Sequence, residues 1–191
     1  MNIGIFSGSF NPIHIGHLVL ANYITEYTSL DEVWLLVTPH NPLKNNVVLL
    51  DESLRLEMCR LALNDFPKIK ISDIEFRLAR PSYTIDTLRA LDDQYPQHTF
   101  SLIVGADNWA IFDKWKNHTQ IIDKYKLYVY PRLGHSVEVA NEWSERVEIL
   151  DSPIIEISST FIRQGLYEGK NMRAFLPQDV YEFIQKNKLY Q

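Results

Sequence analysis

Two histidines in a glycine-containing segment near the start of the chain are the residues best suited to chemistry. His14 and His17 lie three residues apart in Gly8-Ser9-Phe10-Asn11-Pro12-Ile13-His14-Ile15-Gly16-His17. If a helix has begun by His14, this spacing puts both imidazoles on one helix face, pointing toward a common pocket. The segment follows an apolar run and precedes an amphipathic one, and a strand, turn and helix in that order aim backbone N–H groups at an anion. The sequence predicts a phosphate site with two imidazole donors.

A second segment with anion-binding character lies late in the chain, at Ser158-Ser159-Thr160-Phe161-Ile162-Arg163. A helix that starts with serine and threonine exposes N–H and hydroxyl groups, and its dipole favours an anion there. Arg163 follows within one turn, where its guanidinium can donate two hydrogen bonds to phosphate oxygens. Taken alone, this pattern fits a capped helix with a surface arginine equally well. For the two histidines the alternative is a capped junction that binds nothing, and it is less favoured because both lie beside Gly8, Ser9 and Gly16.

A third segment, Gly105-Ala106-Asp107, follows an apolar run and carries a weaker signal. Glycine, any residue and aspartate after a strand also form an ordinary turn with a helix cap. In the functional interpretation, Gly105 lets a ribose approach the backbone and Asp107 accepts a hydrogen bond from a sugar hydroxyl.

Apolar runs and amphipathic segments alternate along the chain, and this alternation predicts the elements that position these residues. We expect strands at 3–6, 32–37, 69–71, 99–104, 127–130 and 147–150. We expect helices at 18–27, 51–63, 82–95, around Trp109 and Trp115, at 158–163, and from Pro177 onward. The pattern favours an α/β fold, a Rossmann-like parallel sheet with helices on both faces, as a single domain over 1–191. In such a sheet ligands bind at the carboxyl ends of the strands, so the three segments should line one cleft.

Composition limits the classes of function. Hydrophobic residues at 46% and charged residues at 23% are ordinary for a globular protein. The net charge of -5 argues against sequence-independent nucleic-acid binding, which needs a basic surface. Cys59 is the only cysteine, so an internal disulfide and a cysteine-based zinc site are excluded, and no metal-ligand cluster stands out. No apolar run approaches the roughly 20 residues of a membrane span. We expect a cytoplasmic protein without membrane or nucleic-acid partners, and leave homo-oligomer formation open.

These segments also resemble those of a known family. The first resembles the signature of the nucleotidyltransferase superfamily, which shares its His-x-Gly-His element with class I aminoacyl-tRNA synthetases. The second is similar to the Ile-Ser-Ser-Thr…Ile-Arg signature of the adenylyltransferases. Ser82-Tyr83-Thr84 and Trp115 resemble the segments that surround the pyridine ring in bacterial nicotinate-nucleotide adenylyltransferases. The chain is identified as a member of that family, which implies a fold of nucleotidyltransferase type.

The resemblance implies a reaction, its substrates and a set of site residues. The adenylyl group of ATP, which brings Mg²⁺, would pass to nicotinate mononucleotide, giving deamido-NAD and pyrophosphate in NAD biosynthesis. The residues expected to neutralise phosphate charge in catalysis are His14, His17, Lys44 and Arg163. The residues expected to bind ATP are Gly8, Ser9, Phe10, His14, His17, Gly105, Asp107, Ser159, Thr160 and Arg163. The residues expected to bind the nicotinate nucleotide are Lys44, Tyr83, Thr84 and Trp115, with Trp109 as the rival aromatic residue.

The loop after the second predicted strand departs from the family pattern. Many relatives carry Pro-Pro-His-Lys where this chain has Asn41-Pro42-Leu43-Lys44, so Leu43 replaces a hydrogen-bonding histidine. Asn11 stands where some relatives have aspartate. The residues leave open an enzyme that uses nicotinamide mononucleotide, phosphopantetheine or another phosphorylated acceptor, and a non-catalytic nucleotide-binding regulator. The chain has no room for the anticodon-binding domain of a class I synthetase.

Overall fold

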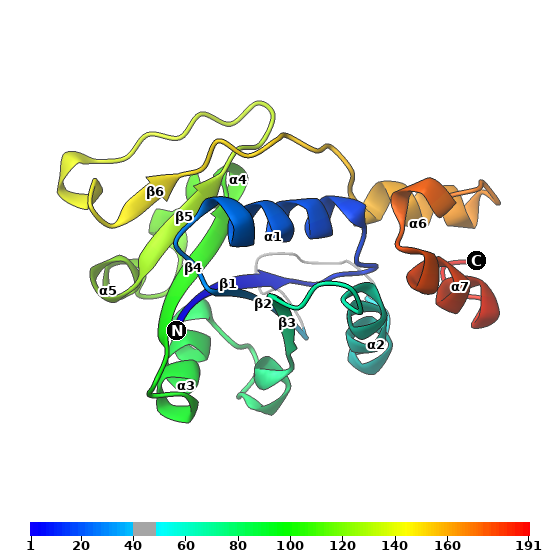
Figure 1. Ribbon diagram of the computed structural model, residues 1–191, viewed down its shortest axis with the longest axis horizontal. Coiled ribbons are helices and arrows are strands. Elements are labelled where there is room, and N and C mark those ends of the chain that lie inside the picture. The colour runs from blue at the N-terminus through cyan, green and yellow to red at the C-terminus, as the bar shows by residue number, and fades with distance from the viewer. Residues whose placement is uncertain (40–48) are drawn as a thin grey trace.

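The computed structural model describes residues 1–39 and 49–191, and within them six strands form one parallel sheet (Figure 1). The strand order is β3-β2-β1-β4-β5-β6. The strands are β1 (Asn2–Gly8), β2 (Glu32–Val37), β3 (Ile69–Ser72), β4 (Thr99–Gly105), β5 (Lys126–Tyr130) and β6 (Val147–Ile149). The predicted Rossmann-like sheet is confirmed, and its order reverses between β1 and β4, the switch point where such sheets bind ligands.

The helices that connect the strands follow the predicted order. They are α1 (Ile15–Tyr27), α2 (Glu52–Ala62), α3 (Thr84–Gln94), α4 (Ala106–Trp109), α5 (His118–Lys124), α6 (Ser159–Tyr167) and α7 (Gln178–Lys186). Short 3₁₀ helices lie at Ile74–Arg77, Phe112–Lys114, Asn141–Trp143 and Arg173–Phe175. The sequence did not predict α5, because it has seven residues and its buried Ile121 and Ile122 are adjacent, which gives no helical stripe. Asp51 caps α2 as expected, accepting a hydrogen bond from the Ser53 N–H at 2.8 Å.

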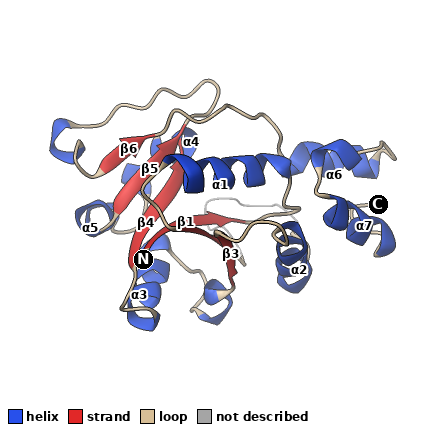
Figure 2. Ribbon diagram, viewed as in Figure 1, coloured by secondary structure: helices blue, strands red, loops and turns tan. Residues whose placement is uncertain are grey.

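Helices cover both faces of the sheet, as the sequence predicted (Figure 2). Side chains alternate along β1, so that Phe6 packs into one buried cluster while Ile3 and Ile5 pack into the other. The first cluster contains buried residues of α1, α2, α6 and α7, and the second contains those of α3 and α5. Burial of each such side chain stabilises the fold by about 2 kcal/mol, so the carboxyl ends of β1 and β4 are held by a rigid framework.

In the described ranges, no helix is long and apolar enough to cross a membrane.

Candidate active site

Two adjoining cavities open at the carboxyl ends of β1 and β4. The smaller has a volume of about 220 Å³ and the larger about 410 Å³. Both are lined by Phe6, Ser7, Gly8, Ser9, Asn108 and Tyr130. The end of β1 therefore separates two chambers that meet at its last residues, an arrangement suited to two substrates that react with each other.

Three side chains donate hydrogen bonds to backbone carbonyl groups of the turn after β1, residues 9–13, which we call the signature turn. Arg55 Nη1 donates to the Ser9 carbonyl at 2.7 Å, and Arg163 Nη1 donates to the Asn11 carbonyl at 2.8 Å. Ser159 Oγ donates to the Pro12 carbonyl at 2.8 Å. The signature turn is thus fixed by residues of α2 and of α6, and the two segments singled out in the sequence are in direct contact.

The two histidines are brought together, but not as the sequence predicted. α1 begins at Ile15, and His14 is its N-cap residue in an extended conformation with a φ of -147°. The condition that the helix has begun by His14 is therefore not met, because His14 lies one residue before the first helical residue. His14 N–H donates to His17 Nδ1 at 3.2 Å, and the rings stack with centroids 3.7 Å apart. Because Nδ1 of His17 accepts this bond, the uncharged form of the ring carries its hydrogen on Nε2.

His14 is neutral at physiological pH. The side chain is 4% exposed, and burial, followed by the nearby charge of Arg132, lowers its pKa to about 4. A Cβ on Gly16 would lie 3.1 Å from the His14 ring, so this glycine leaves the space that the imidazole occupies. Without a neighbouring anion, His14 is therefore a neutral hydrogen-bonding group, and its expected part in neutralising phosphate charge stays a prediction.

The start of α6 forms one wall of the larger cavity. Ser158, Ser159, Thr160 and Arg163 line it together with His14, His17 and Phe10. Ser158 caps the helix by accepting from the Phe161 N–H at 3.1 Å, as its position predicted. Arg163 Nη2 also donates to Thr160 Oγ1 at 3.2 Å, so the guanidinium spans the signature turn and the helix start. This wall combines hydroxyl groups, a helix N-terminus and a fixed cation, which suits phosphate groups.

Arg132 is a cation of the larger cavity that the sequence interpretation missed. It follows β5 by two residues, and the rule that functional residues follow strand ends would have found it. Its Nη2 donates to Tyr130 Oη at 3.3 Å, and its Nε lies 3.7 Å from Asp107 Oδ1. A Cβ on Gly105 would lie 2.4 Å from Asp107 Oδ1, so Gly105 makes room for this carboxylate. The expectation that Gly105 also admits a ribose stays a prediction.

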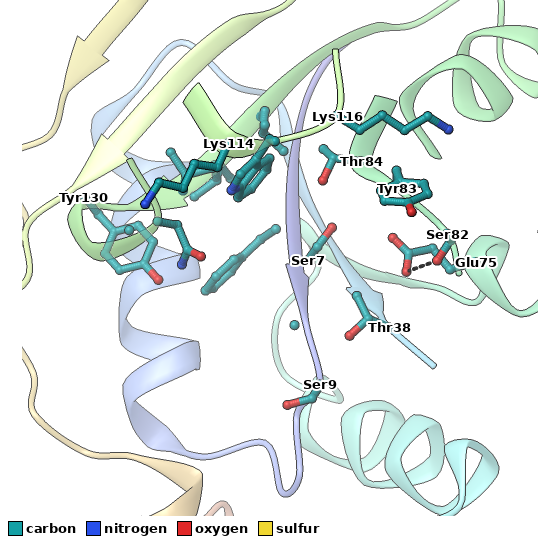
Figure 3. A pocket seen from close by; sticks show the side chains of 18 residues that line it. Ser7, Ser9, Thr38, Glu75, Ser82, Tyr83, Thr84, Lys114, Lys116 and Tyr130 are labelled. Carbon is teal, nitrogen blue, oxygen red and sulfur yellow. Dashed lines mark hydrogen bonds between the residues drawn. The ribbon is translucent and has the colours of Figure 1, made fainter. Parts of the chain in front are cut away.

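The smaller cavity contains the segments expected to contact a pyridine ring (Figure 3). Tyr83 and Thr84 at the start of α3 line it, and so does Trp115. Trp109 lies outside it, stacked on Phe112 at 5.2 Å and donating from Nε1 to the Glu138 carbonyl at 3.0 Å. Of the two tryptophans, Trp115 is therefore the one that faces the cavity.

Three charged residues of the smaller cavity were not anticipated from the sequence: Glu75, Lys114 and Lys116. Glu75 is 6% exposed, and its carboxylate accepts from Thr87 Oγ1 at 3.1 Å and from Ser82 Oγ at 3.4 Å (Figure 3). Burial raises the pKa of Glu75. The two lysines flank Trp115, and Lys116 Nζ lies 4.3 Å from the centre of the Tyr83 ring. Lysines on both sides of a predicted ligand-binding tryptophan were the signal available in the sequence.

Lys44 and Leu43 lie outside the described residues, so their predicted contributions to phosphate binding have no structural counterpart here. In the described part of the chain, no group of three or more histidine, cysteine, aspartate or glutamate residues is arranged to hold a metal ion. Among the residues that the structure describes, the larger cavity has one lining carboxylate, Asp107, which faces Arg132. These donors do not fit a resident magnesium site, but they fit a cation that arrives on a nucleotide, because Mg²⁺ is often bound through substrate phosphates and water.

The chain is similar to known proteins in both its sequence and its fold. A cytidylyltransferase-like family model matches residues 5–165. A probable nicotinate-nucleotide adenylyltransferase of Flavobacterium johnsoniae is 49% identical over 191 residues, covering 100% of this chain and 99% of the relative. A probable nicotinate-nucleotide adenylyltransferase of Bacteroides fragilis is 54% identical over 181 residues, which cover 95% of this chain and 90% of the relative. The fold matches Plasmodium falciparum nicotinic acid mononucleotide adenylyltransferase complexed with NaAD, with a TM-score of 0.79, 19% identity, and coverage of 99% and 97%.

Proposed function

We infer the roles of the site residues from one premise: the chain belongs to the cytidylyltransferase-like family, among its nicotinate-nucleotide adenylyltransferases. Its function is to transfer the adenylyl group of ATP to nicotinate mononucleotide, forming deamido-NAD and pyrophosphate. One observation supports the assignment of residues: a cavity rich in phosphate-binding groups adjoins a cavity with an aromatic wall, and they share the end of β1.

ATP is proposed to occupy the larger cavity with its phosphates between α1 and α6. Arg163 and Arg132 supply positive charge there, and the hydroxyls of Ser159 and Thr160 lie at the same wall. His17 lines the same cavity and is proposed to donate a hydrogen bond to a phosphate oxygen. The negative charge of a bound triphosphate raises the pKa of His14, which lets this residue share a proton with the phosphates. Asp107 is proposed to bind the ribose hydroxyls of ATP.

Nicotinate mononucleotide is proposed to occupy the smaller cavity. The indole face of Trp115 suits stacking on the pyridine ring. The backbone N–H groups at the start of α3, near Tyr83 and Thr84, suit a carboxylate better than an uncharged carboxamide. The lysines beside Trp115 add positive charge, and the nucleotide 5′-phosphate is expected at the shared turn of Gly8 and Ser9. Lys44 remains a predicted phosphate ligand from outside the described residues.

The chemistry follows from this placement. An oxygen of the acceptor 5′-phosphate attacks the α-phosphorus of ATP, and the bond from that phosphorus to the bridging oxygen breaks as pyrophosphate leaves with the electron pair. The attacking group is already an anion, so the reaction needs no general base. Catalysis then consists of alignment and of charge stabilisation by His17, Arg132 and Arg163. Mg²⁺ is proposed to enter with ATP and to neutralise charge on the leaving phosphates.

The test is pyrophosphate release from ATP and Mg²⁺ with nicotinate mononucleotide, and in parallel with nicotinamide mononucleotide and phosphopantetheine. Much faster release with the nicotinate is expected, because its carboxylate is recognised at α3. Release with only another acceptor would keep the reaction and refute the acceptor site. A folded protein that binds ATP but releases no pyrophosphate with any of the three would favour a nucleotide-binding regulator. The cytoplasmic location remains a prediction.

A further inference from the structure

The chain after α7 turns back toward the signature turn that follows β1. Two non-glycine residues there, Lys188 and Tyr190, have left-handed backbones with φ of 51° and 63°. The Leu189 N–H donates to the Ile184 carbonyl at 3.0 Å, which fixes the direction of the segment as it leaves α7. Figure 1 shows this end of the chain (C) beside α7. Left-handed backbone is unfavourable for residues with a side chain, so packing and hydrogen bonds must hold this reversal in place.

Tyr190 makes a direct hydrogen bond to the signature turn. Its hydroxyl donates to Asn11 Oδ1 at 2.8 Å across 179 positions of sequence. Asn11 is 1% exposed, and the same Oδ1 also accepts from the Leu50 N–H at a longer 3.4 Å. The Asn11 carbonyl accepts from Arg163. The side chain of Asn11 therefore binds Tyr190, and the backbone carbonyl of the same residue binds Arg163, which lines the larger cavity.

The surroundings of Tyr190 keep its hydroxyl a donor. Burial raises the pKa of Tyr190, outweighing the nearby charges of Arg163 and Arg55, which lower it. Both arginines are held by the turn itself, Arg55 on the Ser9 carbonyl and Arg163 on the Asn11 carbonyl. The neutral phenol thus contributes a hydrogen bond beneath the turn next to two fixed cations. Tyr190 is not one of the described residues that line the two cavities. It therefore acts on the site through Asn11.

We propose that Tyr190 is a positioning residue for adenylyl transfer, which holds Asn11 and thereby sets the turn and the Arg163 guanidinium that face the ATP phosphates. The inference rests on the proposed placement of ATP in the larger cavity. Of the two hydrogen bonds that Asn11 Oδ1 accepts from described residues, loss of the hydroxyl leaves the longer one, and the turn gains freedom where the phosphates must be aligned. The expected effect falls on ATP binding and turnover, while the pyridine-binding cavity at α3 is unaffected.

The test compares Tyr190→Phe with the matched control Tyr167→Phe, which changes an exposed tyrosine on α6, the helix that carries Arg163. Tyr190→Phe is expected to lower kcat/KM for ATP by about 5-fold, the usual scale for one hydrogen bond, with KM for nicotinate mononucleotide unchanged. Affinity for a non-hydrolysable ATP analogue, measured by calorimetric titration, should fall in the same variant. Because that titration needs no turnover, it tests the role of Tyr190 even if the proposed acceptor is wrong.

A second pair of variants separates positioning from general stability. In an Asn11→Asp background, which keeps the acceptor oxygen, Tyr190→Phe should lower the affinity for the ATP analogue as much as it does in the wild type, or more. In an Asn11→Ala background, which removes the acceptor, the same change should lower the affinity for the ATP analogue by less than 2-fold. Wild-type affinity for the ATP analogue in Tyr190→Phe would overturn the proposal. An equal loss in Tyr190→Phe with and without the Asn11 acceptor would also overturn it, because the hydroxyl would then act elsewhere.

Discussion

The imidazole rings of His14 and His17 stack at a centroid distance of 3.7 Å with 27° between their planes, although His14 lies outside α1. Their contact is fixed by the hydrogen bond from the His14 N–H to His17 Nδ1. The two rings therefore differ in their environments. His17 lines the larger cavity, and the buried His14 ring, which packs against it, is neutral at physiological pH.

Replacement of His17 by alanine should leave the fold intact and reduce turnover strongly. The side chain lines the larger cavity and is proposed to donate to the phosphates, and loss of a donor to transition-state charge costs about 100-fold to 1000-fold in kcat. Steady-state pyrophosphate release measures the effect, with circular dichroism as the check on folding. His135→Ala, at an exposed position, is the control. Near-normal turnover in His17→Ala would remove His17 from the mechanism.

His14 should make the stability of the protein depend on pH between about 6.5 and about 4. Its pKa is lowered from 6.5 to about 4 in the folded state, so in this range the unfolded chain binds more protons. The stabilisation is complete above pH 6.5 and is lost as the pH falls toward 4. The wild type should therefore lose roughly 3 kcal/mol more unfolding free energy over this range than His14→Gln does. Urea titrations at pH 4, 5, 6.5 and 8 measure the difference, and parallel profiles for the two proteins would contradict it.

Much of this site was predictable, because the residues that follow parallel strands meet at one edge of the sheet. The signature turn and the start of α6 were found from short-range patterns of glycine, hydroxyl and histidine residues, and the start of α3 was found only through the family resemblance. Arg132 was missed because it follows a strand without such a pattern around it. Arg55 and Tyr190 could not be found this way, since an arginine in a helix and a tyrosine near the chain end acquire their roles only through long-range contacts to Ser9 and Asn11.

Arg55 should be a major source of stability for the turn. The side chain is 0% exposed and donates to the carbonyls of Ser9, Thr38, Pro39 and Leu50. Arg55→Met removes all four bonds and leaves buried acceptors unpaired, which should cost about 3 kcal/mol or more. Arg55→Lys keeps the charge without the planar set of donors and should recover only part of that loss.

Chemical denaturation measures these losses, and the control is Arg60→Met on the same helix. Arg60 is paired with Glu57 in an exposed contact of 3.5 Å, so its loss should change the unfolding free energy by about 0.5 kcal/mol or less. Equal stability losses at the two arginines would contradict the role of Arg55.

Addition of one methyl group at Gly105 should displace Asp107. The new Cβ would lie 2.4 Å from Asp107 Oδ1 and 3.0 Å from the Tyr130 ring, and the short aspartate side chain is the easier of the two to move. Gly105→Ala should therefore raise KM for ATP by about 10-fold, as expected for loss of a charge-assisted hydrogen bond to the ribose. Asp107→Ala should produce a similar effect, and the double variant should be no worse than either. Additive losses would show that Gly105 acts separately from Asp107.

Trp115 should carry the binding of the pyridine ring, whereas Trp109 should not. Trp115 lines the smaller cavity, and the indole of Trp109 is stacked on Phe112 outside it. Trp115→Phe should weaken nicotinate mononucleotide binding by about 5-fold and leave the KM for ATP unchanged, because aromatic stacking contributes about 1 kcal/mol. Quenching of tryptophan fluorescence by nicotinate mononucleotide should persist in Trp109→Phe and be largely lost in Trp115→Phe. Quenching lost in the first variant and retained in the second would assign the ring to the other tryptophan and move the acceptor out of the smaller cavity.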